Sequence, residues 1–313
     1  MEERLIGLAE ARGGTFTAGD AERVGMHEHD LVRLCRVGSI VRIRRGAYVL
    51  AESLQDVSPE RGLAVRTRAV MATRPDSVAS HQAALAMHGL PLYGLPLHVV
   101  DVLGDVNRVR LESRVRMHPR VRVPETVEVD GMDCVPVAVA VAQVTLRHGL
   151  LAGLVPADAA LHRGMCTMET IAGALGDRAR TTKAKATARQ LLAHTDPVCE
   201  SPGETRTRIL LRDLDLGEDV RSQVSLYDGD GDFVARVDFL VGERVVVEFD
   251  GLVKYAAGAG REAVIDEKRR EDAIRALGYL VVRLTWADLE RPGRVGALVR
   301  RALVAASAQR PVG

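Results

Sequence analysis

The chain has 313 residues, of which 47% are apolar and 27% charged, and its formal net charge at pH 7 is +1. This composition excludes a disordered chain, and the length allows two or three domains with separate cores. The sequence contains no apolar run long enough to span a membrane and no signal-peptide pattern, so we expect a cytoplasmic protein without a membrane partner. Four widely spaced cysteines without a CxxC pair indicate neither a disulfide framework nor a zinc cluster.

The first segment predicts three short helices followed by a β-hairpin. An amphipathic helix covers Arg4–Arg12, Thr17 is a suitable N-cap for a helix over Ala18–Val24, and a third helix covers Met26–Val37. The alternation of SIVRIRRGAYVLA breaks at Gly46, as expected for a tight hairpin. This order is typical of a winged helix-turn-helix domain, in which the last helix enters the major groove of DNA.

Arginine clusters interrupt the balanced charge in two places. The stretch Leu31–Leu50 contains five arginines and no acid, and Val106–Val123 contains six arginines against Glu112. Such clusters suit a polyanion, although a solvated strand face is an equal alternative for the second one. In the first segment we expect DNA contacts from helix residues His27, Glu28, His29, Arg33 and Arg36, and phosphate contacts from Arg42, Arg44 and Arg45.

A middle region mixes helical and strand patterns and ends at a clear boundary. The stretch SVASHQAALAMHGLPL predicts a helix ended by Gly89 and Pro91, the following residues alternate like strands, and helical patterns then return. Two prolines and a glycine in DPVCESPGE mark the next boundary. We therefore expect domains over residues 1–55, 56–196 and 197–313.

The stretch GTFTAGDAERVGMHEHDLVRLCRVGSIVRIRRGAYVL resembles the N-terminal domain of AbiEi-type antitoxins, the DNA-binding members of type IV toxin–antitoxin pairs. This resemblance implies double-stranded DNA and a cognate toxin as partners, and a role in transcription regulation. The middle region resembles the middle part of AbiEi-like regulators, which implies DNA binding or homodimer formation.

From Glu200 onward the pattern predicts a helix, three strands, a helix, a strand and a last helix. The first helix begins with a serine cap, a proline in the first turn and Glu204. The strands are QVSLY, FVARVDFL and RVVVEFDG, followed by the helix EKRREDAIRALGY, the strand LVVRLTW and the helix ADLERPGRVGALVRRAL.

Three carboxylates lie within these otherwise apolar strands. Glu248 and Asp250 are two residues apart and therefore point to one face, and Asp238 joins them if the loop Gly242–Arg244 sets Asp238 opposite Glu248. In that register the Cβ atoms of Asp238 and Glu248 lie about 5 Å apart. Carboxylates so close repel each other unless a proton or a cation lies between them, and a divalent cation is the simplest candidate.

The motifs SPGETRTRILL, ARVDFL, VVVEFDGLVKY, EKRREDAIRALGY and VVRLTW resemble the PD-(D/E)XK nucleases, most closely their very-short-patch-repair-like branch. The resemblance implies DNA phosphodiester hydrolysis with Mg²⁺, or Mn²⁺ in its place. It also implies that Asp238, Glu248 and the Phe249 carbonyl bind the metal, while Glu204 holds a second ion or a water ligand.

The sequence departs from that superfamily at Asp250, where a lysine is usual. The lysine orients the attacking water and offsets charge in the transition state. Two lysines are candidates to replace it: Lys268 as the catalytic group and Lys254 as a contact to phosphate or water. Arg283, on the following strand, is expected to contact the scissile phosphate.

Two functions therefore remain open. The first is a Mg²⁺-dependent DNA endonuclease, and the alternative is a non-catalytic AbiEi-like regulator that uses a degenerate nuclease fold for dimerisation or partner binding. In the second case the charges form a metal-free network that pins the sheet. Both agree with one fold class, an α+β and α/β multidomain protein with a winged helix, a mixed middle domain and a nuclease-like mixed sheet flanked by helices. The residues of the expected network are Arg236, Asp238, Asp250, Lys268 and Arg283.

Overall fold

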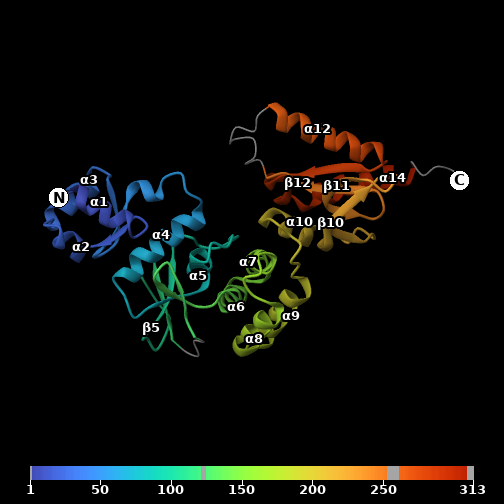
Figure 1. Ribbon diagram of the computed structural model, residues 1–313. Helices are drawn as coiled ribbons and strands as arrows, with labels where there is room; N and C mark the ends of the chain where they lie inside the picture. The colour runs from blue at the N-terminus through green and yellow to red at the C-terminus, as the bar shows by residue number, and fades with distance from the viewer. Residues whose placement is uncertain (1, 121–124, 252–260, 309–313) are drawn as a thin grey trace. The chain divides into compact units, whose positions relative to one another are not determined.

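The computed structural model describes residues 2–120, 125–251 and 261–308 (Figure 1). The chain divides into two compact units, Met1–Thr195 and Asp196–Gly313. Both units combine helices with strands, so the predicted mixed α/β multidomain class is confirmed. Within the described residues, no helix is both long and apolar enough to cross a membrane.

The first unit begins with three helices and a three-stranded antiparallel sheet. Helix α2 starts after Thr17, whose hydroxyl accepts a hydrogen bond from the Asp20 amide at 3.1 Å, so the predicted cap is confirmed. The sheet has the order β1-β3-β2, and its first strand was not expected because it is only three residues long. The elements are α1 (Glu2–Glu10), β1 (Thr15–Thr17), α2 (Ala18–Arg23), α3 (Glu28–Arg36), β2 (Ile40–Arg44) and β3 (Ala47–Leu50).

A small apolar core holds this part together. Leu5 of α1, Leu31 and Leu34 of α3, and the stacked rings of Phe16 and Tyr48 are all buried. The helices therefore pack on one face of the sheet. Helix α4 (Pro59–Ala72) also contacts β3, in a second cluster of Ala47, Val49, Val65 and Ala69. The domain boundary expected after residue 55 stays a prediction.

A six-stranded mixed sheet and a group of helices make up the rest of this unit. The strand order is β6-β7-β5-β4-β9-β8, with β5 and β7 parallel. The strands are β4 (Val78–Ala79), β5 (Val100–Gly104), β6 (Arg110–Glu112), β7 (Val115–Pro119), β8 (Val127–Val129) and β9 (Met132–Cys134). After the short 3-10 helix η1 (Ala51–Leu54) and α4, the helices are α5 (His81–Met87), α6 (Val137–His148), α7 (Leu150–His162), α8 (Met168–Arg178) and α9 (Thr182–His194).

The second unit is a four-stranded sheet with helices on both faces. Its strand order is β10-β11-β12-β13; the first two pairings are antiparallel, whereas β12 and β13 are parallel. Figure 1 shows α12 on one side of this sheet and α10 on the other. Side chains of α10 and α14 share a core with one face, whereas Ile274 of α12 packs on the other. The elements are α10 (Pro202–Asp213), β10 (Val220–Tyr227), β11 (Phe233–Val241), β12 (Val245–Phe249), α12 (Arg261–Ala276), β13 (Leu280–Leu284), α13 (Trp286–Leu289) and α14 (Pro292–Ala308).

The predicted hairpin register is confirmed. Strands β11 and β12 are joined by Gly242–Arg244, and the pairs run from Val241↔Val245 to Phe239↔Val247. The next step of this register sets Asp238 opposite Glu248. The predicted last helix is divided into α13 and α14, because a new helix begins at Pro292.

Candidate functional site

A row of polar residues crosses the four strands of the second unit at one level. In β10, the pairs Ser222↔Phe239 and Val224↔Val237 set Gln223 opposite Asp238. One step beyond the last β11–β12 pair, the register sets Asp238 opposite Glu248, which pairs with Arg283 of β13. The apolar pattern of these strands is therefore interrupted on all four strands together, which concentrates charge at one place in the sheet.

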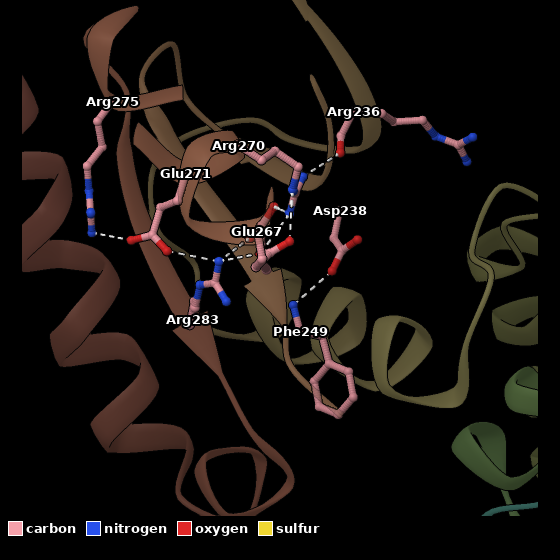
Figure 2. A network of polar contacts seen from close by, with 9 residues as sticks. Arg236, Asp238, Phe249, Glu267, Arg270, Glu271, Arg275 and Arg283 are labelled. Atoms are coloured by element: carbon pink, nitrogen blue, oxygen red, sulfur yellow. Dashed lines mark hydrogen bonds and ion pairs between the residues drawn. The ribbon is translucent and has the colours of Figure 1, made fainter. Parts of the chain in front are cut away.

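Asp238 is the least neutralised acid of this row. Its Oδ2 accepts a hydrogen bond from the Phe249 amide at 2.8 Å (Figure 2). Burial, together with the charges of Glu204 and Glu248, raises the pKa of Asp238 to about 6 despite that bond. The predicted proximity of Asp238, Glu248 and Glu204 is thus visible in the electrostatics of Asp238.

Glu204 reaches the site from the first turn of α10. Ser201 caps this helix by accepting from the Glu204 amide at 3.2 Å, and Pro202 opens the first turn, as predicted. The buried Glu204 carboxylate accepts from the Glu200 amide at 2.9 Å and from Gln223 Nε2 at 2.7 Å, both on Oε2. These bonds aim Glu204 at the row of polar residues.

Glu248 is neutralised by arginines from two other elements. Arg270 of α12 donates from Nη2 to Glu248 Oε1 at 2.6 Å, and Arg283 Nη2 lies 3.7 Å from Glu248 Oε2. Arg283 also pairs with Glu267 at 2.5 Å and with Glu271 at 2.9 Å. Three carboxylates and two arginines therefore form a nearly balanced network, which we call the α12 network: Glu248, Glu267, Arg270, Glu271 and Arg283.

The α12 network differs from the network that the sequence predicted. Of the residues expected there, Arg283 is a member, and Arg236 takes part through its carbonyl, which accepts from Arg270 Nη1 at 3.2 Å. The Arg236 side chain instead pairs with Glu200. Arg270 was missed because three consecutive basic residues occupy one helical turn, and only the phase set by Ile274 shows which of them points inward.

The structure describes only one of the two candidate lysines. Lys254 lies outside the described residues, so its catalytic role stays a prediction. Lys268 is exposed on α12. Asp250 follows the end of β12, where its amide donates to the Leu284 carbonyl at 2.7 Å.

Most of the side chains predicted to contact DNA are exposed. His27, Arg33 and Arg36 lie on or next to α3, and Arg42 and Arg45 lie on the hairpin of β2 and β3, which we call the wing. Arg44 differs: its Nε and Nη1 are buried and have no hydrogen-bond partner within the described residues. Burial and the nearby charge of Arg74 lower the pKa of Arg44 from its usual range. In the second arginine cluster, Arg122 falls in the range that the structure does not describe.

Comparison with known proteins gives one finding for the N-terminal part. Residues 3–51 match the sequence model of a family described as a transcriptional regulator, AbiEi antitoxin. This range begins at the second residue of α1 and ends one residue after β3. A search of curated proteins finds no significant match for the chain.

Proposed function

We propose that the chain is a DNA-binding transcriptional regulator that contacts duplex DNA through its N-terminal residues. The observation that carries this proposal is the match of residues 3–51 to the AbiEi antitoxin family, over a segment with the helix and wing order of a winged helix domain. In that arrangement α3 enters the major groove and the wing lies along the phosphate backbone.

The exposed cations divide into two roles. Arg33 and Arg36 on α3, with His27 at its start, are placed to reach base edges or flanking phosphates. Arg42 and Arg45 on the wing contact phosphates, which contributes affinity rather than sequence preference. Arg44 contributes less, because its guanidinium is partly buried.

Fluorescence anisotropy with a duplex from the region upstream of the gene tests this proposal. Arg42→Ala/Arg45→Ala should weaken binding at least tenfold, whereas Arg301→Ala, which removes an exposed arginine of α14, should leave it unchanged. Equal affinity of the wing variant and the wild type would contradict the proposal.

The AbiEi match also supports a protein partner. Antitoxins of type IV pairs act beside a toxin, so a cognate toxin is the partner we propose for this chain, together with a second copy of the chain on DNA. Sedimentation of the purified chain with and without a duplex tests the second part, since a dimer doubles the protein bound per site.

A second candidate function is Mg²⁺-dependent hydrolysis of DNA in the second unit. It is favoured by Asp238, a buried acid whose pKa is raised to about 6 beside Glu204 and Glu248. The donor set fits Mg²⁺ or Mn²⁺, because all three side chains offer carboxylate oxygens and the Phe249 carbonyl adds a fourth. A bound Mg²⁺ supplies a Lewis acid and an activated water for phosphodiester hydrolysis.

The residues of the site contribute in different ways to this second function. Asp238 uses Oδ2 for the Phe249 amide and Glu204 uses Oε2 for two donors, so Asp238 Oδ1 and Glu204 Oε1 are the oxygens that would face a cation. Glu248 would first have to give up its contact with Arg270. Released, Arg270 would offset charge in the transition state, but arginine keeps its proton and cannot act as the base. Lys268 and Lys254 stay the proposed groups for orienting water.

Plasmid cleavage in Mg²⁺ or Mn²⁺ tests the second function. Asp238→Asn should abolish cleavage, and Asp230→Asn, which changes an exposed acid of the neighbouring turn, should not. Cleavage that persists in EDTA, or in Asp238→Asn, would contradict it. The regulator proposal does not depend on this result.

A further inference from the structure

A separate cluster of metal-binding side chains is buried in the first unit, away from the winged helix core. His81 is the first residue of α5, Asp101 lies in β5, and His118 lies in the neighbouring parallel strand β7. Each of these residues offers a nitrogen or oxygen ligand, and the ligand atoms all lie within 4.8 Å of one another. In the described part of the chain, the carboxylate oxygens of Glu204, Asp238 and Glu248 do not all lie within this distance of one another.

The two histidine rings of this cluster face each other. Their centroids are 4.1 Å apart and their planes differ by 18°, so the two rings are stacked. Burial, and next the charge of His118, hold the pKa of His81 well below its usual range.

Neighbouring side chains hold the three residues in place. Gln82 Nε2 donates to Asp101 Oδ2 at 2.5 Å, Ser80 Oγ contacts His81 Nδ1 at 3.0 Å, and the His81 amide donates to Gln143 Oε1 at 2.9 Å. The backbone of His81 has φ +51°, which is unfavourable for a residue with a Cβ. Such outer contacts are typical of metal sites, because they fix the orientation of each ligand.

Two buried polar atoms beside the cluster have no hydrogen-bond partner within the described residues. They are Gln82 Oε1, on a fully buried side chain, and His148 Nε2, at the end of α6. The charge of His148 affects the pKa of His81, so the two rings lie near each other. A metal ion in a site of this kind keeps bound water, and water supplies the hydrogen-bond partner that both atoms lack.

Two features oppose a bound cation and set an upper limit on its affinity. Arg116 Nη1 lies 3.3 Å from both oxygens of Asp101 and competes for this carboxylate. His118 Nε2 lies 2.6 Å from Asp101 Oδ1, whereas two ligands of a tetrahedral zinc ion lie about 3.3 Å apart. An ion would therefore separate this pair by about 0.7 Å and shift the His118 proton to Nδ1.

We propose that His81, Asp101 and His118 form a binding site for a divalent transition-metal ion such as Zn²⁺. Imidazole nitrogens with one carboxylate suit zinc, cobalt and nickel, and they suit Mg²⁺ poorly. The ion links α5 to β5 and β7 of the six-stranded sheet, so it stabilises the first unit. The site is independent of both functions proposed above.

Metal titration of the full chain, first stripped with EDTA, tests this site. Calorimetry with Zn²⁺ and absorption spectroscopy with Co²⁺ should show one bound equivalent, and Zn²⁺ should raise the temperature of thermal unfolding. His118→Asn and Asp101→Asn should each weaken binding at least tenfold. The control His98→Asn, which changes an exposed histidine near the start of β5, should bind as the wild type does.

A gain in affinity separates a metal site from a purely structural polar cluster. Arg116→Gln removes the competing cation and should tighten Zn²⁺ binding severalfold, a result that loss of folding cannot produce. No Zn²⁺ uptake by the wild type and by Arg116→Gln would overturn the proposal. Equal affinity of His118→Asn and the wild type would overturn it too.

Discussion

The Phe249 amide donates a hydrogen bond to Asp238 Oδ2 at 2.8 Å, one step beyond the last backbone pair of the β11–β12 hairpin. The Phe249 ring packs edge-on against the ring of Trp286, with the two centroids 4.8 Å apart. Phe249 therefore links the most perturbed acid of the site to the helices that cover the sheet. The stability of the second unit should depend on the protonation of Asp238.

Asp238→Asn should stabilise the second unit at neutral pH. The folded-state pKa of Asp238 is raised to about 6 from 3.8, so this group favours folding below pH 3.8 and loses that contribution as pH rises through 6. The asparagine keeps an oxygen for the Phe249 amide but carries no charge. We expect the variant to gain about 2–3 kcal/mol over the wild type at pH 7.5, and only about 1 kcal/mol at pH 4.5.

Urea unfolding followed by the fluorescence of Trp286, the only tryptophan of the chain, measures this difference in the second unit. Asp230→Asn, in the exposed turn before β11, is the matched control. A pH-independent difference between Asp238→Asn and the wild type would show that the carboxylate is not desolvated. If Mg²⁺ binds the site, it should stabilise the wild type and leave the variant unaffected.

Glu248→Gln should destabilise the second unit, because it removes a buried charge from the α12 network. Arg270 and Arg283 would keep Glu267 and Glu271 as partners. We therefore expect the free energy of unfolding to fall by about 2 kcal/mol, less than when one partner of an isolated buried ion pair is removed. The loss should persist in 0.5 M salt, where exposed pairs are screened by a Debye length of about 4 Å.

An exposed pair on the same helix provides the control for Glu248→Gln. Asp266 and Arg269 are 3.3 Å apart with more than 70% of each side chain exposed, so Asp266→Asn should leave the urea midpoint unchanged. Equal effects of the two substitutions would mean that the α12 network contributes no more than surface charges do.

Local signals in the sequence were sufficient for much of this fold. Thr17 and Ser201 are side-chain caps whose bonds span three residues, and Gly242–Arg244 fixes the hairpin register by its length. The helix caps and the hairpin loop each depend only on residues close in the chain, so the sequence alone is enough to predict them. The register in turn predicted the proximity of Asp238 and Glu248.

The partners of those acids could not be predicted in the same way. Arg270 reaches Glu248 across 22 residues, and its competitors Lys268 and Arg269 have the same charge and lie within the same turn. Only the packing of Ile274 against the sheet decides which side chain points inward. His81, Asp101 and His118 likewise come close together only because of the strand order of the six-stranded sheet, which no local pattern specifies.

The salt dependence of DNA binding should show whether the arginines of the wing contact phosphates. If Arg42 and Arg45 each contact a phosphate, their joint replacement by alanine lowers the slope of log K against log salt by about 2. Arg44→Ala should change the slope less, because its guanidinium is partly buried. A larger change for Arg44→Ala than for Arg45→Ala would indicate that the wing rearranges on DNA.

Gly203→Ala should destabilise the second unit strongly, because the start of α10 lies directly against Phe249. A Cβ at Gly203 would lie 1.9 Å from Phe249 Cε1, so either the helix or the ring must move. Overpacking of this kind costs about 1–3 kcal/mol or more, and the shift would also displace Glu204, the next residue. Gly229→Ala is the control, since its added Cβ would have nothing within 4 Å.

Removing the obstacle should rescue the variant, so Gly203→Ala/Phe249→Leu should lose less stability than the two single variants together. Additive losses in this double-mutant cycle would mean that the close approach of α10 to Phe249 does not limit the fold.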